Sequence, residues 1–328
     1  MAGEMSRTER VTAALRGEPV DRVPVSAWWH EWDREWSATD LASATLESYG
    51  RYGWDYIKVN PRYTYYAEDW GTTYESFPDR APIIRTRAVE SAEDLARLRS
   101  VDGTASAFGE QLEALRLIGA ELKGEAPFIQ TVFTPLAVMT VMTGSPKFVR
   151  KLMEEHPAEL QRALGEIEST LIEYSKASLD CGASGIFLAS VEWGSADNIS
   201  WADYERFGQP YDLRILASVA DAPFNVFHVC QNHNHLPNLL AYPIPAFHWA
   251  VHGEGNLSLG EALKQTDKAA MGGVRQRTML SGETAALAAE AAEAVGQTGG
   301  TRFLLGPGCS IAPETPRANL QALAEAPR

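Results

Sequence analysis

The sequence predicts an α/β fold of the (β/α)8 TIM-barrel class. Eight short apolar segments alternate with helical segments along the 328 residues, and this alternation is typical of a barrel of parallel strands. No linker rich in Gly, Ser or Pro interrupts the alternation, so we expect residues 1–328 to form a single domain. No apolar run approaches the roughly 20 residues that a membrane span needs. We therefore expect a cytoplasmic protein without a membrane partner.

The first half of the chain is predicted to open with a helix and then to supply three of the strands. Ser6 and Glu9 form a capping box before this helix, and Gly17 can close it. Residues 63–75 show no clear period and are predicted to form a loop, whereas residues 83–87 suit a hairpin at the edge of the barrel. The strands are expected at residues 21–25, 56–60 and 128–132, and two further helices at residues 41–49 and 108–122.

The second half of the chain contains the clearest helical region and the other five strands. Pro146 and Pro157 stand where a helix favours its first residue, and the second of these helices is expected to reach about residue 179. The remaining strands are expected at residues 185–189, 224–229, 246–251, 269–272 and 303–305, and helices at residues 200–219, 258–265, 284–298 and 316–323. Barrel enzymes gather their chemistry at the carboxyl ends of the strands, so we expect the functional site there.

One histidine and two cysteines at strand ends form a candidate metal site. Side chains alternate along a strand, so His228 and Cys230 are predicted to project from the same face at the end of the fifth strand. Cys309 follows the eighth strand in a glycine-proline turn. Three cysteines at wide spacing argue against a disulfide framework. The plainer alternative is a buried His–Cys pair that packs in a strand without a metal.

The donor set indicates zinc if a metal is bound. Thiolate and imidazole are ligands that suit Zn²⁺, and three protein ligands leave one coordination position for a substrate. A thiol bound at that position would lose its proton near neutral pH and become a nucleophile.

Other residues near strand ends are candidates for proton transfer and substrate binding. The candidate acids and bases are Glu192, which is also a candidate fourth ligand, His233, His248 and His252. The candidates for substrate binding are Trp28, Trp29, His30, Trp193, Gln231 and Arg275. Several have a plainer alternative: a solvated loop for His233 and its neighbour His235, a surface carboxylate for Glu192, core packing for at least two of the tryptophans at positions 28, 29, 32 and 36, and an exposed salt bridge for Arg275.

Four segments together resemble the uroporphyrinogen decarboxylase superfamily. They are residues 7–25, the His228-x-Cys230 strand end, residues 272–274 and residues 306–316. Within this superfamily the His-x-Cys…Cys set is similar to the methylcobamide:thiol methyltransferase branch. The resemblance implies zinc on His228, Cys230 and Cys309 and the transfer of a methyl group between a corrinoid and a thiol. The sequence contains no Asp-x-His-x-x-Gly corrinoid signature, so a corrinoid would arrive free or on a separate protein.

Two segments depart from the patterns of the superfamily. Decarboxylases carry an arginine-bearing segment after the first strand, whereas residues 27–36 contain one arginine among acids and tryptophans, which suits a polyanionic tetrapyrrole poorly. Both branches commonly place glycine after the cysteine of strand five, whereas residues 231–235 here read Gln-Asn-His-Asn-His. We therefore expect a substrate different from those of the better-known members.

Three functions are compatible with the sequence. The first is a zinc-dependent methyltransferase that acts on a small thiol or a methylated small molecule. The second is a metal-independent decarboxylase or lyase that acts on a small carboxylic acid, and the third is a barrel that binds a small ligand without catalysis. The net charge of −14 provides no basic stripe for nucleic acid. The expected partners are a small-molecule substrate, a corrinoid protein and a second copy in a homodimer.

Overall fold

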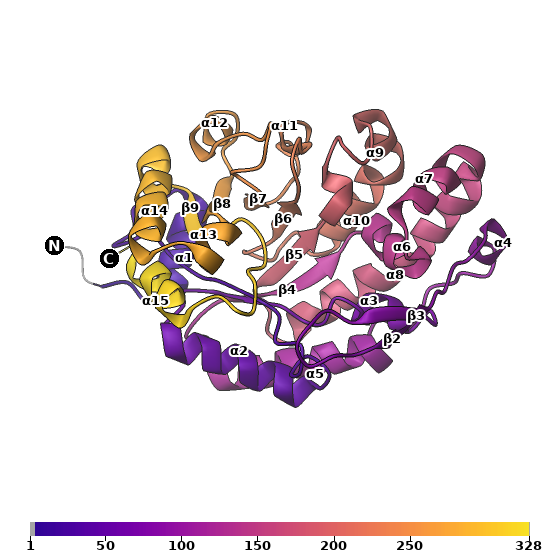
Figure 1. Ribbon diagram of the computed structural model, residues 1–328, viewed down its shortest axis with the longest axis horizontal. Helices are drawn as coiled ribbons and strands as arrows, with labels where there is room; N and C mark the ends of the chain where they lie inside the picture. The colour runs from indigo at the N-terminus through magenta and orange to yellow at the C-terminus, as the bar shows by residue number, and fades with distance from the viewer. Residues whose placement is uncertain (1–3, 328) are drawn as a thin grey trace.

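A curved sheet of parallel strands forms the centre of the computed structural model, which describes residues 4–327 (Figure 1). Within this range the sheet has seven strands in the order β1-β4-β5-β6-β7-β8-β9, and each neighbouring pair is parallel. The strands are β1 (Ile57–Val59), β4 (Phe128–Phe133), β5 (Gly185–Ala189), β6 (Val226–Val229), β7 (Ala246–Trp249), β8 (Ala269–Val274) and β9 (Phe303–Pro307). Seven of the eight predicted strands are therefore confirmed as regular strands.

The strand predicted at residues 21–25 does not form a regular strand, and the barrel is not fully closed there. Val25 makes only an isolated parallel bridge to Leu305 of β9. On the other side, the Val25 carbonyl accepts from the amide of Asp55, 2.9 Å away. The Val25 amide donates to the Asp55 carboxylate at 2.9 Å rather than to a strand, and Pro24 has no amide proton to donate. The prediction of a complete eight-stranded barrel is thus corrected to a curled, nearly closed sheet.

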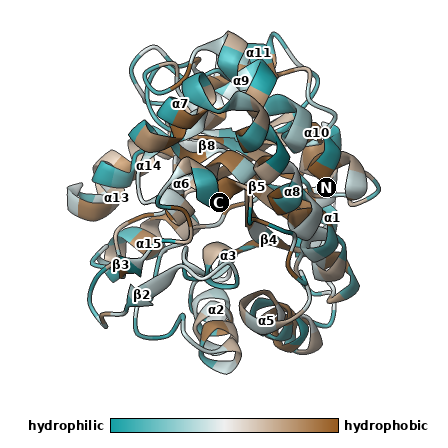
Figure 2. Ribbon diagram, turned by 90° about the vertical axis from the view of Figure 1, so that its right-hand side faces the viewer, coloured by the Kyte–Doolittle hydropathy of each residue, from teal (hydrophilic) through white to brown (hydrophobic). Residues whose placement is uncertain are grey.

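Side chains alternate between the inside of the curled sheet and its outer face. On β6, Val226 packs with the inner cluster, which includes Tyr56, Phe187 and Met271, and Phe227 packs with the large outer cluster beneath the helices. Figure 2 shows that strands such as β5 and β8 are largely hydrophobic, whereas the outer loops are mostly hydrophilic. The side chains of His228 and Cys230 lie on the same inner face of the sheet as that of Val226, as the alternation predicts.

Helices surround the sheet (Figure 1). Ser6 and Glu9 form the predicted capping box of α1, and Gly17 ends this helix with φ 72°, a left-handed conformation that glycine adopts without strain. The helices are α1 (Arg7–Arg16), α2 (Ala38–Tyr52), α3 (Tyr65–Glu68), α4 (Ala92–Leu95), α5 (Ser106–Leu122), α6 (Pro135–Thr143), α7 (Pro146–Glu155), α8 (Pro157–Asp180), α9 (Trp201–Phe207), α10 (Gln209–Ser218), α11 (Leu236–Leu239), α12 (Leu259–Leu263), α13 (Gln276–Ser281), α14 (Thr284–Thr298) and α15 (Arg317–Glu325). In the described range no helix is long and apolar enough to cross a membrane.

Two local predictions differ from the structure, and helix α6 was not predicted. Residues 63–75 are not an irregular loop, because they contain α3 and β2 (Thr73–Glu75). Strand β2 pairs antiparallel with β3 (Ile83–Thr86), which confirms the predicted hairpin. The single helix predicted at residues 200–219 is divided at Gly208 into α9 and α10. Helix α6, which the sequence reasoning missed, follows β4 directly and is apolar on most of its surface, so it lacks the alternation of polar and apolar residues that signals a helix.

Candidate metal centre

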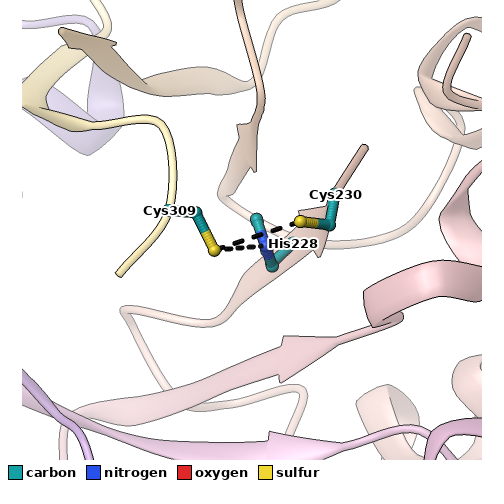
Figure 3. Close-up of side chains that lie close together, drawn as sticks. All are labelled: His228, Cys230 and Cys309. Carbon is teal, nitrogen blue, oxygen red and sulfur yellow. Dashed lines mark hydrogen bonds between the residues drawn. The ribbon is translucent and has the colours of Figure 1, made fainter. Parts of the chain in front are cut away.

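Two elements far apart in the sequence bring the three predicted ligands together. His228 lies on β6 and Cys230 directly after it, while Cys309 lies two residues beyond the end of β9. Figure 3 shows the three side chains pointing toward one another. Within residues 4–327 this is the one group of three or more His, Cys, Asp or Glu side chains whose ligand atoms are close enough to hold a metal ion, all within 4.8 Å of one another.

Two of the three distances within this group fit a tetrahedral zinc ion. The two sulfur atoms are 3.9 Å apart, and Cys309 Sγ is 3.7 Å from His228 Nε2. Zinc lies about 2.3 Å from sulfur and about 2.0–2.1 Å from nitrogen, so tetrahedral angles would separate two sulfurs by about 3.8 Å and sulfur from nitrogen by about 3.6 Å. The group therefore has the donor atoms of a zinc site, and two of its three distances have the spacing of zinc ligands.

The two thiols influence each other's ionisation. Cys230 Sγ donates a hydrogen bond to Cys309 Sγ, and this bond, helped by the contact with His228, lowers the pKa of Cys309 well below its usual value. The pKa of Cys230 is raised, first because the Cys309 sulfur holds its proton and second because the thiol is buried. The Cys309 thiolate therefore forms readily, and its negative charge disfavours a second thiolate on Cys230. A cation between the sulfurs would favour both thiolates.

His248 lies beside His228 on the neighbouring strand β7, where the two residues are paired in register. Its ring is completely buried. Its Nδ1 atom lies 2.7 Å from Nδ1 of His228, and its Nε2 atom lies 2.8 Å from the carbonyl oxygen of Pro307. Burial and the neighbouring His228 lower the pKa of His248 to about 3. Because both ring nitrogens have partners and no surface is exposed, His248 is not placed to carry protons to a substrate, in contrast to the role expected from the sequence.

Glu192 lies near the three ligands but outside their group. It belongs to the 3-10 turn η1 (Val191–Gly194), which follows β5. One of its carboxylate oxygens is buried without a hydrogen-bond partner, and burial raises its pKa. Its charge contributes to the raised pKa of Cys230. Glu192 is therefore a half-buried acid beside the site rather than the surface carboxylate of the plainer alternative.

Lys58 is a buried charged residue beside the site that the sequence reasoning missed. It lies on β1, donates a hydrogen bond to Asn60 Oδ1 and lies 4.9 Å from the centre of the Phe187 ring. Burial lowers its pKa to about 7, and the nearby Cys309 acts in the opposite direction. The signal was present in the sequence, because a lysine stands in an otherwise apolar strand on the same face as Asn60.

Trp28 and Trp29 line a small cavity of about 50 Å³ that also reaches Lys58 and Asn60. Trp28 is buried, and its ring meets the His248 ring edge-on at 5.2 Å. Trp29 makes an isolated bridge to Ile311, two residues beyond Cys309. The aromatic segment predicted to wall a pocket thus lies beside the metal group.

Two of the predicted substrate-binding residues have structural partners instead. Trp193 is completely buried, and its indole N–H donates to the Leu136 carbonyl and to Thr140 Oγ1, so it belongs to the core. Arg275 is exposed and pairs with Glu290 at 2.6 Å. For Arg275 the plainer alternative of an exposed salt bridge therefore describes the structure.

The predicted side chains in the loop after β6 are not part of the metal group. Gln231 and His233 are exposed and have left-handed φ values of 69° and 45°. His233 Nδ1 lies 3.0 Å from Asp197, and this contact raises the pKa of His233. His235 is buried with Nε2 3.0 Å from the carbonyl oxygen of Ile199. Neither histidine is part of the ligand group.

The last two candidates are His252 and His30. His252 follows β7, and its Nε2 atom lies 2.9 Å from the carbonyl oxygen of Gly273. His30 Nδ1 lies 2.8 Å from Glu35, and its ring stacks on Trp32 with centres 4.1 Å apart. Both are half-buried and remain candidates for contact with a substrate.

Comparisons with known proteins agree with this fold. The family description for uroporphyrinogen decarboxylase (URO-D) matches residues 33–328. A methylcobamide:CoM methyltransferase MtbA from Methanosarcina acetivorans is 25% identical over 98% of this chain and 97% of its own length. A uroporphyrinogen decarboxylase from Myxococcus xanthus is 32% identical over 55% of this chain and 52% of its own length. The solved structure of a methyltransferase from Methanosarcina mazei has the same fold, with a TM-score of 0.80 at 23% identity over 98% of both chains.

The fold and the site together define an α/β barrel-like protein with a His-Cys-Cys group at the carboxyl ends of its strands. The chain belongs to the uroporphyrinogen decarboxylase (URO-D) family, as its motifs predicted, and its relatives in this family are enzymes.

Proposed function

We propose that this chain is a zinc-dependent methyltransferase that moves a methyl group between a corrinoid, or another methyl donor, and a small thiol or methylated small molecule. The observation that carries the proposal is the spacing of His228, Cys230 and Cys309, with sulfur–sulfur and sulfur–nitrogen distances of 3.9 and 3.7 Å. The relative named as a methylcobamide:CoM methyltransferase, which aligns over 98% of this chain, supports the same class. The proposal treats residues 1–328 as one domain, in line with the family match over residues 33–328.

The residues of the chain would act mainly by holding and shielding the reacting groups. His228, Cys230 and Cys309 would hold zinc and leave a fourth position for a substrate thiol. A zinc ion at this site supplies a Lewis acid that favours the thiolate form of that thiol near neutral pH. Phe187 stacks on the His228 ring with centres 5.2 Å apart, so one side of the site is apolar and excludes water.

In the transfer itself, the sulfur of the thiol attacks the methyl carbon after losing its proton. The sulfur–carbon bond forms as the bond between the methyl carbon and its donor breaks, and the electron pair of the broken bond stays with the donor. Because the sequence has no corrinoid signature, a corrinoid donor would be free or bound to a separate protein. In the reverse direction the same metal would polarise a leaving sulfur or oxygen.

The test combines metal content with methyl transfer. The purified full-length protein should contain about one zinc per chain, and it should consume methylcobalamin in the presence of a small thiol such as coenzyme M or 2-mercaptoethanol. Cys230→Ser and Cys309→Ser should lose zinc and activity together. Cys181→Ser is the matched control, because Cys181 lies at the end of α8 and outside the ligand group. Full activity in either ligand variant would contradict the proposal.

A metal-independent decarboxylase or lyase that acts on a small carboxylic acid is the second candidate. The family description and the partial match to a uroporphyrinogen decarboxylase favour it. This function predicts that both ligand cysteines tolerate serine with little loss of rate, so the same two variants distinguish the candidates.

A further inference from the structure

We propose that His248 is the positioning residue of the metal centre: it selects the tautomer of His228 that leaves Nε2 free for the metal, and it ties the turn that carries Cys309 to the sheet. This inference rests on the metal site proposed above and goes beyond it, because His248 is not itself a ligand. Its ring contacts both halves of the site, through His228 on one side and Pro307 on the other.

The carbonyl oxygen of Pro307 determines which nitrogen of His248 carries the proton. A carbonyl oxygen only accepts hydrogen bonds, so the Nε2 atom of His248, 2.8 Å away, must be the donor. The ring is completely buried, and its polar contacts are with His228 and Pro307 rather than with a carboxylate, so a second proton would create an unpaired buried charge. His248 is therefore neutral, with a lone pair on Nδ1.

The lone pair on His248 in turn determines the tautomer of His228. The two Nδ1 atoms are 2.7 Å apart, and because His248 Nδ1 accepts, His228 Nδ1 must donate. The other contact of His228 Nδ1 is the backbone carbonyl oxygen of His248 at 3.3 Å, which is also an acceptor and favours the same tautomer. His228 Nε2, which lies 3.7 Å from Cys309 Sγ, is thus the ring nitrogen that remains available to a metal.

The same side chain also positions the second half of the site. Pro307 is the last residue of β9 and precedes Cys309 by two residues, so the bond from His248 Nε2 holds the start of the Cys309 turn. His228 and His248 are directly paired on adjacent strands, and the Trp28 ring packs against His248. A ring fixed by packing thus connects β6, β7 and the end of β9. Substitution of a residue that hydrogen-bonds to a metal ligand typically weakens metal affinity by about 10–100-fold.

The tautomers are measurable without any variant. Full-length protein labelled with ¹⁵N-histidine, studied metal-free by long-range ¹H–¹⁵N correlation, should show the proton of His228 on Nδ1 and that of His248 on Nε2. Addition of zinc should shift the Nε2 signal of His228 and leave both tautomers unchanged. A His228 Nδ1 atom without a proton would overturn the inference, and this result does not depend on whether the protein transfers methyl groups.

Variants measure the consequence for the metal. The zinc dissociation constant, determined by competition with a chromophoric chelator, should rise about 10–100-fold in His248→Phe. His248→Gln should lose less, because its amide retains one donor and one acceptor. His235→Phe is the matched control, since His235 is also buried with a ring nitrogen against a carbonyl oxygen but lies outside the site, and its affinity should equal that of the wild type.

The outcomes separate this inference from the proposed function. Wild-type affinity in His248→Phe would refute the positioning role. A wild-type protein that binds no zinc would refute the proposed function, whereas the tautomers of the metal-free protein would still decide the inference. If His248→Phe does not fold, the spectra of the wild type and the affinity of His248→Gln decide it.

Discussion

Asp212 makes the stability of this protein depend on pH. Its carboxyl group is completely buried on α10, where Oδ2 accepts hydrogen bonds from Tyr204 and Tyr242 and Oδ1 has no partner. Burial raises the pKa of Asp212 from 3.8 to about 7, although the two tyrosine hydroxyls act in the opposite direction. The folded protein therefore keeps a proton that the unfolded chain releases at lower pH.

The sign and size of the effect follow from this difference in pKa. Between pH 3.8 and about 7 the folded state binds more protons at Asp212 than the unfolded state, so the free energy of unfolding falls as pH rises. The contribution is complete below pH 3.8 and is lost by the time the pH has passed about 7. At 1.36 kcal/mol for each pH unit, the gap of about three units corresponds to a loss of about 4 kcal/mol.

The substitution Asp212→Asn tests this value because it removes the ionisation and keeps an oxygen that the tyrosines can donate to. In urea unfolding measured at intervals from pH 4 to pH 8, the stability of the variant relative to the wild type should increase by about 4 kcal/mol. Asp221→Asn, at an exposed position, is the control and should follow the wild type. Parallel curves for Asp212→Asn and the wild type would refute the reasoning.

Two further predictions concern buried contacts outside the site. Asp55→Ala should lower the free energy of unfolding by about 3–5 kcal/mol in urea titrations, because it removes a buried carboxylate that pairs with Arg10 at 2.7 Å and with Arg22; a loss below about 1 kcal/mol would contradict this. Gly185→Ala should cost about 1–3 kcal/mol by thermal unfolding, since the added carbon would lie 2.3 Å from the Phe224 carbonyl oxygen. Gly165→Ala, with no atom within 4 Å of the added carbon, is the control. Equal losses of stability in the two variants would contradict the close contact between Gly185 and the Phe224 carbonyl.

The part of the site that follows from strand periodicity was predictable from the sequence. Alternation along residues 224–230 placed His228 and Cys230 on one face, and the position after the eighth predicted strand placed Cys309 at the same end of the sheet. The structure brings these three side chains within 4.8 Å of one another. Local rules also located most helices, because caps such as Ser6 and Gly17 act within a few residues of each other.

Features that depend on pairing between distant segments were not predictable in this way. The role of His248 depends on its register opposite His228 and on the carbonyl of Pro307, 59 residues away along the chain. The prediction of a first strand was wrong because the Val25 amide donates to the side chain of Asp55. No local pattern in residues 21–25 reveals this contact. Long-range pairings of this kind become visible only in the folded structure.

The zinc content of the purified full-length protein tests the central claim most directly. Elemental analysis should find about one zinc per chain in the wild type and in Cys181→Ser. It should find little in Cys309→Ser, which removes a ligand 3.7 Å from His228 Nε2. A wild-type protein that remains free of zinc after incubation with the metal, yet catalyses its reaction at full rate, would contradict the account.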